Sequence, residues 1–139
     1  MAVERTFGII KPNAVRNGHI GEIIDAIERE NFTIHGLRMV HLNTELIAGF
    51  YQEHVGKPFY EELESFMLEG PVILMVLEGE DVIRRWREIM GATDPVKAAP
   101  GTLRRKFADS LTRNAVHGSD APATAEREVH YFFSAFDLV

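Results

Sequence analysis

The histidine at position 117 is the residue of this chain with the clearest chemical potential. The segment Asn114-Ala-Val-His-Gly-Ser-Asp120 places an apolar pair before His117 and a Gly-Ser-Asp turn after it. Such a turn lets the ring stand clear of the backbone, and an imidazole with an ordinary pKa of about 6.5 is largely neutral near pH 7. A neutral ring nitrogen attacks electrophiles, so His117 is a candidate nucleophile. The alternative is that His117 is a structural histidine in a turn. The residues that accompany it in the sequence must decide between these two interpretations.

A few cationic residues could bind phosphate, although the chain as a whole has a negative net charge. The chain has 15 Lys and Arg against 21 Asp and Glu, a net charge of −6, which disfavours broad nucleic-acid binding. Arg87 and Arg104 carry planar, permanently charged groups that suit the oxygens of a transferring phosphoryl group. Thr93 can donate a hydroxyl to the same phosphates. Arg84, Arg85 and Arg127 fit a solvated helix face better.

Several other kinds of site are excluded by motifs that are missing from the sequence. The chain has no G-x-x-x-x-G-K-[ST], no G-x-G-x-x-G and no H-E-x-x-H, so a P-loop, a dinucleotide fold and that zinc site lack support. No cysteine is present, which excludes disulfides and thiolate metal sites. The remaining histidines are predicted to be structural or at the surface: His19, His35, His41, His54 and His130.

The elements that would position these residues follow from hydrophobic periodicity and turn residues. Glu78–Asp81 is expected to be a turn that gives the next helix an acidic start. Residues 91–113, with Pro95, Pro100 and Gly101, are expected to be a long loop that is either functional or disordered. Strands are predicted at 5–10, at 32–42 with a bulge at Gly36, at 71–77, and just before His117. Helices are predicted at 18–31, from a cap at Asn43 or Thr44 to a break at Gly56-Lys57-Pro58, from Phe59 to Met67, at 82–90, and from Pro122 through Phe136.

The order of these elements predicts an α+β fold, a ferredoxin-like split β-α-β sandwich with a four-stranded antiparallel sheet covered by helices. At 139 residues, with 45% hydrophobic residues, the chain is expected to form a single domain over residues 1–139. The apolar run after Glu4 and Arg5 is too short for a signal peptide or a membrane span, so a cytoplasmic location with no membrane partner is expected.

The residues around His117 resemble the active-site pattern of nucleoside diphosphate kinases, and the resemblance runs along nearly the whole chain. The NAVHGSD segment is its most specific part. The matching pieces, in order, are Lys11-Pro12, Tyr51 with Glu53, Pro58-Phe59 with Leu63, Arg87, Gly91-Ala-Thr93, Pro100-Gly-Thr-Leu-Arg104, Asn114–Asp120 and Glu128.

The resemblance implies transfer of the γ-phosphate of a nucleoside triphosphate to a nucleoside diphosphate, by a ping-pong reaction through a phosphohistidine on His117. Glu128 would orient the ring, and Tyr51 and Ser119 would complete the hydrogen bonding around that pair. The arginines would offset the effect of Glu128 on the histidine pKa. The resemblance also implies a catalytic role for Lys11. The residues implied to bind the nucleotide are Lys11, Phe59, Leu63, Arg87, Thr93, Arg104, Leu111 and Asn114, with the base stacked between Phe59 and Leu111.

The implied cofactor is Mg²⁺, carried by the nucleotide phosphates because the sequence has no obvious carboxylate cage. The implied partners are nucleoside tri- and diphosphates and further copies of the chain, as a tetramer or a hexamer. Asn13 and Lys106 depart from the family pattern, which often has acidic residues there, but neither change removes a group assigned to the chemistry.

Two alternatives belong to other functional classes. The first is a non-catalytic nucleotide-binding module on the same scaffold, since fold does not determine function. The second is a nucleic-acid-binding protein that uses Arg104–Lys106, which the net charge disfavours. The joint presence of the nucleophile, its carboxylate partner and both arginines favours the enzyme.

Overall fold

The structure, a computed structural model, describes residues 3–139. Its centre is a four-stranded antiparallel sheet with the strand order β2-β3-β1-β4. The strands are β1 (Val3–Ile10), β2 (Thr33–Val40), β3 (Val72–Glu80) and the short β4 (Val116–Gly118). This order, with helical crossovers between the strands, confirms the predicted ferredoxin-like sandwich.

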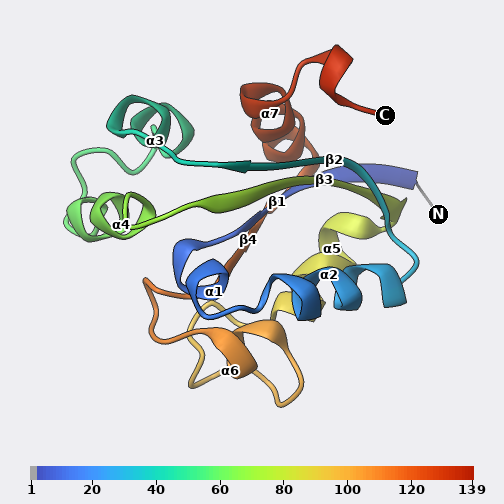
Figure 1. The fold of residues 1–139 in the computed structure, drawn as a ribbon, viewed down its shortest axis with the longest axis horizontal. Helices are drawn as coiled ribbons and strands as arrows, with labels where there is room; N and C mark the ends of the chain where they lie inside the picture. Colours follow the sequence, from blue (N-terminus) through green and yellow to red (C-terminus); the bar gives the residue numbers. More distant parts are fainter. Residues whose placement is uncertain (1–2) are drawn as a thin grey trace.

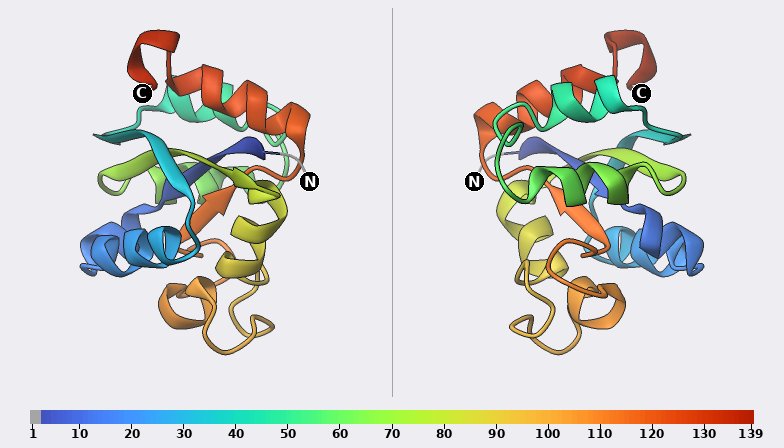
Figure 2. Two further views of the ribbon diagram at one scale, coloured as in Figure 1. Left: turned by 90° about the vertical axis from the view of Figure 1, so that its right-hand side faces the viewer. Right: turned by 90° about the vertical axis from the view of Figure 1, so that its left-hand side faces the viewer.

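Helices cover both faces of the sheet. Figure 2 shows α3 and α7 above it and α2 and α5 below it, and Figure 1 shows α6 beyond α5, away from the sheet. The helices are α1 (Pro12–Arg16), α2 (Ile20–Arg29), α3 (Thr44–Phe50), α4 (Tyr60–Met67), α5 (Val82–Met90), α6 (Leu103–Phe107) and α7 (Pro122–Phe132), followed by a 3₁₀ turn at Ala135–Asp137. Within residues 3–139, none of the helices combines the length and apolar character needed to span a membrane.

The hydrophobic core lies in two layers because the strand side chains alternate between the faces. On one face, Phe7 and Ile9 of β1 pack against α3, α4 and α7. On the other face, Ile10 packs against α1, α2 and α5, where Trp86 is fully buried. The apolar run of β3 is buried through Leu77, as expected for a central strand covered on both sides.

Several predicted local features are present. Asn43 caps α3, and its side chain accepts a hydrogen bond from the Leu46 backbone at 2.8 Å. The pairing of β2 with β3 shifts register between Ile34 and Gly36, which is the predicted bulge. A Cβ at Gly36 would lie 2.9 Å from the Phe133 ring, so the close packing of this ring on the strand requires glycine.

The prediction of a turn with an acidic helix start at Glu78–Asp81 was wrong. Strand β3 continues to Glu80, because its pairing with β1 extends to Val3. The reversal is made by Asp81 alone, in a left-handed conformation (φ 50°), and the first turn of α5 holds no acidic residue. Strand pairing with a distant segment therefore overrode the local turn signal.

Four other boundaries also differ from the prediction. The helix capped by Asn43 ends at Phe50, and residues 51–59 form turns instead of continuing it to Gly56. The 91–113 segment contains the helix α6, capped by Thr102, whose five residues are too few to show a period. The short α1 follows Lys11 directly, with Pro12 in its first turn. The last helix ends at Phe132, so Phe136 is not part of its apolar face and is 94% exposed.

Candidate active site

The backbone of His117 is held at the edge of the sheet. His117 lies in β4 opposite Ile9 of β1, and the indole Nε1 of Trp86 donates a hydrogen bond to its carbonyl oxygen at 3.2 Å. Trp86 packs so closely that a Cβ at Gly118 would lie 2.6 Å from the indole Cδ1. The glycine of the His-Gly-Ser-Asp turn is therefore needed for the contact that fixes the histidine.

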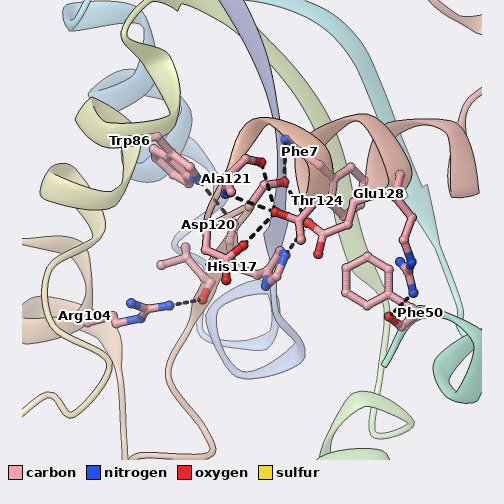
Figure 3. Close-up of polar contacts among 12 residues, drawn as sticks. Phe7, Phe50, Trp86, Arg104, His117, Asp120, Ala121, Thr124 and Glu128 are labelled. Carbon is pink, nitrogen blue, oxygen red and sulfur yellow. Dashed lines mark hydrogen bonds and ion pairs between the residues drawn. The ribbon is translucent and has the colours of Figure 1, made fainter. Parts of the chain in front are cut away.

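The His117 ring is oriented through one of its two nitrogens. Nε2 donates to Oε1 of Glu128 on α7 at 2.9 Å, and Oγ of Ser119 donates to the same oxygen at 2.7 Å (Figure 3). The Phe7 backbone in turn donates to Ser119 Oγ. The Phe50 ring stands edge-on to the imidazole with the centroids 5.3 Å apart. Because Nε2 carries the proton, Nδ1 keeps the lone pair and is the nitrogen able to attack.

The ring borders a cleft of about 380 Å³ between α3, α5, α7 and the 91–118 region. A more open hollow of about 680 Å³ adjoins it and shares Arg87, Thr93, Arg104 and Asp120, but does not include His117. The cleft is lined by charged and polar side chains that are far apart in the sequence: Lys11, Tyr51, Glu53, His54, Arg87, Thr93, Arg104, Asn114, His117, Asp120, Thr124, Arg127 and Glu128.

Arg104 is a buried cation of the cleft, at 9% exposure. Its Nη atoms donate to the carbonyl oxygens of Gly91 and Val116, both at 2.9 Å, whereas the buried Nε has no partner among the described residues. Burial, and then the charge of Arg87, lower the pKa of Arg104 to about 10, so it stays positive at pH 7. The guanidinium thus places an unneutralised charge beside the nucleophile.

Lys11 is a second buried basic residue of the cleft. Its Nζ donates to Asn114 Oδ1 at 2.8 Å, and Asn114 Nδ2 donates to the Leu111 carbonyl. Burial, and then Arg104, lower the pKa of Lys11 to about 7. Within residues 3–139, neither Lys11, Arg87 nor Arg104 forms an ion pair with a carboxylate. Cations gathered without acidic partners make an anion site.

The pKa of His117 lies below its ordinary value. Burial is the main cause, the hydrogen bond and charge of Glu128 oppose it, and Lys11 and Arg104 lower the pKa further. The expectation that the cations offset the carboxylate therefore misses the largest contribution, which is the removal of the ring from water. The outcome is a ring that is largely neutral at pH 7.

The other predicted residues do not all line the cleft. Thr93 and Arg87 line it and are exposed. Tyr51 lines it with a buried hydroxyl that has no hydrogen-bond partner within residues 3–139, so this hydroxyl does not bind the His117–Glu128 pair. Phe59, Leu63 and Leu111 are absent from the wall. Phe59 and Leu111 are exposed, at 47% and 59%, whereas Leu63 of α4 packs in the hydrophobic core.

Arg127 and His54 belong to the cleft, although the sequence suggested a solvent-facing residue and a structural or surface one. An Nη atom of Arg127 donates to the carbonyl oxygens of Gly49 and Phe50, at 2.9 and 2.8 Å, and so ties the end of α3 to α7. His54 lies in a turn rather than a helix. The position of His54 between Tyr51 and Phe59, both predicted site residues, could have indicated its place in the cleft. For Arg127, only the packing of α3 on α7 reveals it.

The relatives of the chain point to the same chemistry. A family model described as nucleoside diphosphate kinase matches residues 4–138. The nucleoside diphosphate kinase of Aquifex aeolicus is 43% identical, with a TM-score of 0.96 over 99% of this chain and 100% of that one. That of Halobacterium salinarum, solved with CDP, is 41% identical, with a TM-score of 0.96 over 99% and 92%. A family protein of Babesia bovis is 36% identical, with a TM-score of 0.92 over 98% and 92%.

On this α+β sandwich, a carboxylate-held histidine lies among cations that form no ion pair within residues 3–139, an arrangement suited to a phosphotransferase. The chain belongs to the nucleoside diphosphate kinase family. Its function is accordingly that of a nucleoside diphosphate kinase, a transferase that binds nucleotides and acts in nucleotide metabolism.

Proposed function

We propose that His117 is the phosphoryl carrier of this kinase. Its Nδ1 lone pair forms a bond to the γ-phosphorus of a nucleoside triphosphate as the bond from that phosphorus to the β,γ-bridging oxygen breaks. The electron pair leaves with the nucleoside diphosphate. In the second half-reaction, the terminal phosphate oxygen of another diphosphate attacks the phosphohistidine and returns the histidine to its free state. The P–O bonds broken and made are alike, so the overall equilibrium lies near unity.

The residues around the ring have complementary roles in this proposal. Glu128, held by Ser119, orients the imidazole and stabilises the positive charge that develops on it during attack. Arg87, Arg104 and Thr93 bind the phosphates and compensate the charge on the transferring group. Lys11 and Asn114 hydrogen-bond the sugar and the nearby phosphate. The Tyr51 hydroxyl, which has no partner among the residues that the structure describes, is proposed to contact the ligand as well.

The base is proposed to stack on Phe59, with Leu111 opposite and Leu63 beneath. The exposure of the Phe59 ring supports this, because a core phenylalanine would have no free face. Stacking contributes roughly 1–3 kcal/mol per base and depends little on which base it is. One pocket would therefore accept purine and pyrimidine nucleotides.

Mg²⁺ is proposed to enter with the nucleotide. Among residues 3–139, no three of the histidine, aspartate and glutamate side chains gather as a metal site. This fits an ion bound mainly by phosphate oxygens, where it would neutralise charge on the leaving diphosphate.

The orientation of His117 by Glu128 beside an unneutralised Arg104 is the observation that carries the proposal. The test is to mix the protein with γ-³²P-labelled ATP, remove nucleotide, and look for acid-labile label. We expect label on His117 in the native protein and none in His117→Ala. Nucleotide binding without label in the native protein would identify a binding module instead of an enzyme.

We also propose that the chain is one domain and acts in the cytoplasm as a homo-oligomer, a tetramer or a hexamer, with nucleotides rather than membranes or nucleic acids as ligands. Exposed Leu37 and Met39 on the edge strand β2 support self-association, since apolar side chains on an open edge favour pairing. Light scattering on the purified protein gives the mass directly. A monomer at micromolar concentration would contradict the oligomer.

A further inference from the structure

The wall of the cleft that α3 presents to His117 depends on support from outside that helix. Phe50, the last residue of α3, has its ring edge-on to the His117 ring, with the centroids 5.3 Å apart (Figure 3). The His117 side chain is only 19% exposed, and this contact is part of what keeps water from it. A helix of seven residues is too short to be stable by itself, so tertiary contacts determine where α3 lies.

Helix α7 supplies such contacts from two residues that lie one turn apart. The Tyr131 hydroxyl donates to the Leu46 carbonyl of α3 at 2.9 Å. One Nη atom of Arg127 donates to the carbonyl oxygens of Gly49 and Phe50, at 2.9 and 2.8 Å. The two helices are so close that a Cβ at Gly49 would overlap the Tyr131 hydroxyl. The contact between α3 and α7 is therefore specific and tightly packed.

The Arg127 contact suits the end of α3 for two reasons. The last carbonyls of a helix have no donors within the helix, and partial negative charge gathers at that end, which favours a cation there. The Arg127 guanidinium provides both a donor and a positive charge at the last two residues of α3, and the second of these is Phe50. The next residue of α7 is Glu128, which orients His117. One turn of α7 therefore holds the ring directly and also holds, through α3, the wall that covers the ring.

We propose that Arg127 is a positioning residue for His117, because it holds the end of α3 on α7 and thereby keeps Phe50 against the His117 ring and water away from it. The inference rests on the proposed role of His117 as the phosphoryl carrier. It does not require Arg127 to touch the nucleotide. Without Arg127, the end of α3 loses its donors, the ring gains contact with water, and a phosphorylated His117 is less protected from hydrolysis.

The test measures the pKa of His117 in the ligand-free protein by NMR titration. Arg127→Met removes the donors and the charge, whereas Arg127→Lys keeps the charge and a donor. Burial is the main cause of the lowered pKa, so we expect this pKa to rise in Arg127→Met and to return most of the way in Arg127→Lys. Arg127→Gln, a milder change that keeps a donor without the charge, should give a smaller rise.

Kinetics should follow the titration. The acid limb of the kcat/KM–pH profile reports the free enzyme, so in Arg127→Met it should move to higher pH together with the pKa of His117. We expect kcat to fall by up to about 100-fold, the cost of misplacing a reacting group by about 1 Å. Arg29→Met, at an exposed arginine of α2 outside the cleft, is the matched control and should change neither the pKa nor kcat.

A double-mutant cycle separates position from charge. The other charged groups that face His117 are left unchanged by Arg127→Met, and they are Glu128, Lys11, Arg104 and Asp120. We expect Phe50→Leu alone to raise the pKa of His117, and Arg127→Met in that background to raise it little further, because both changes act on one contact. A full rise in the Phe50→Leu background would overturn the proposal, since the Arg127 charge would then act on the ring through space.

An unchanged pKa of His117 in folded Arg127→Met would overturn the proposal too, even with a higher KM for ATP, because Arg127 would then serve the nucleotide. The titration needs no phosphorylated intermediate, so absence of label on His117 in the native protein would count against the phosphohistidine alone. Where label forms, it should be lost to water faster in Arg127→Met than in the native protein once nucleotide is removed.

Discussion

The two sides of the cleft differ in how well the protein satisfies its own polar groups. On the side of β4 and α7, the His117 ring, Glu128 and Ser119 form a closed set of hydrogen bonds. On the side of the 51–59 turn, the Tyr51 hydroxyl and His54 Nδ1 are buried and have no hydrogen-bond partner in the described part of the chain, and Phe59 is exposed. The first side holds its groups in place by hydrogen bonds within the protein, and the second has polar atoms that a ligand could satisfy.

This difference matches the two tasks of a kinase that exchanges one nucleotide for another. The nucleophile gains from a fixed orientation, because reorganisation during attack would add to the barrier. The nucleotide must enter and leave in each half-reaction, so its contacts are better left open than built into the fold. Arg104 combines the two properties. Hydrogen bonds to two carbonyl oxygens fix its position, yet its charge has no ion-pair partner within residues 3–139.

The sharpest test of the contrast compares the two arginines. Arg104→Ala leaves the carbonyls of Gly91 and Val116 without these donors, so we expect the free energy of unfolding to fall by about 2–6 kcal/mol, at about 1–3 kcal/mol per unsatisfied group. Exposed Arg87→Ala should change that free energy by less than about 0.5 kcal/mol. Both should lower kcat by about 10²–10³-fold, since both stabilise charge on the transferring group. Urea unfolding and steady-state kinetics measure the two effects, and equal stability losses would contradict the distinction.

On the complete side, Glu128→Gln should lower kcat by about 10–100-fold, the range seen when a partner that orients a histidine is removed in metal sites. Glu128 raises the pKa of His117 against the effect of burial, so its loss should lower that pKa further. The acid limb of the kcat–pH profile should therefore move to lower pH. A profile that keeps its position would mean that Glu128 is not coupled to the ring.

On the open side, Phe59→Ala should raise KM by about 5–150-fold, the equivalent of 1–3 kcal/mol of stacking, for adenine and guanine nucleotides alike. The thermal unfolding midpoint should stay unchanged because the ring is about half exposed. Phe136→Ala, at an exposed position in the C-terminal 3₁₀ turn, is the matched control and should leave KM unaltered. A loss confined to one base would argue against a stacking platform.

The smallest expected effect is a proton taken up on binding. With a pKa of about 7, Lys11 is mostly neutral at pH 8, and nucleotide phosphates beside it favour its charged form. ADP binding at pH 8 should therefore take up a fraction of a proton, seen by calorimetry in buffers of different ionisation enthalpy. Lys11→Met should abolish the uptake, and uptake that survives the substitution would assign it to another group.

The lowered pKa of Lys11 also affects stability, with a defined sign. The unfolded chain, with the ordinary lysine pKa of 10.5, binds more protons than the folded chain between about pH 7 and 10.5. The contribution of Lys11 to the free energy of unfolding therefore rises with pH through that window and is constant below it. The slope should disappear in Lys11→Met.

Features set by near neighbours in the chain were predictable. The cap at Asn43 and the bulge at Gly36 depend on residue types within a few positions, and both are present. The turn at Glu78–Asp81 and the solvent-facing Arg127 were wrong because segments far away decide them: β1 extends the pairing of β3, and the end of α3 supplies the carbonyls that Arg127 contacts. The helix α6 was missed because five residues carry too little periodicity.

The amino-acid sequence by itself determined the nucleophile segment, its family resemblance and the order of strands and helices, because residue type and spacing encode these directly. Only the tertiary structure decided which nitrogen of His117 is free, that burial dominates its pKa, and that the cations of the cleft lack acidic partners. It also placed His54 and Arg127 in the cleft wall. Burial and pairing depend on which distant segments meet, and that is a property of the folded chain rather than of any stretch within it.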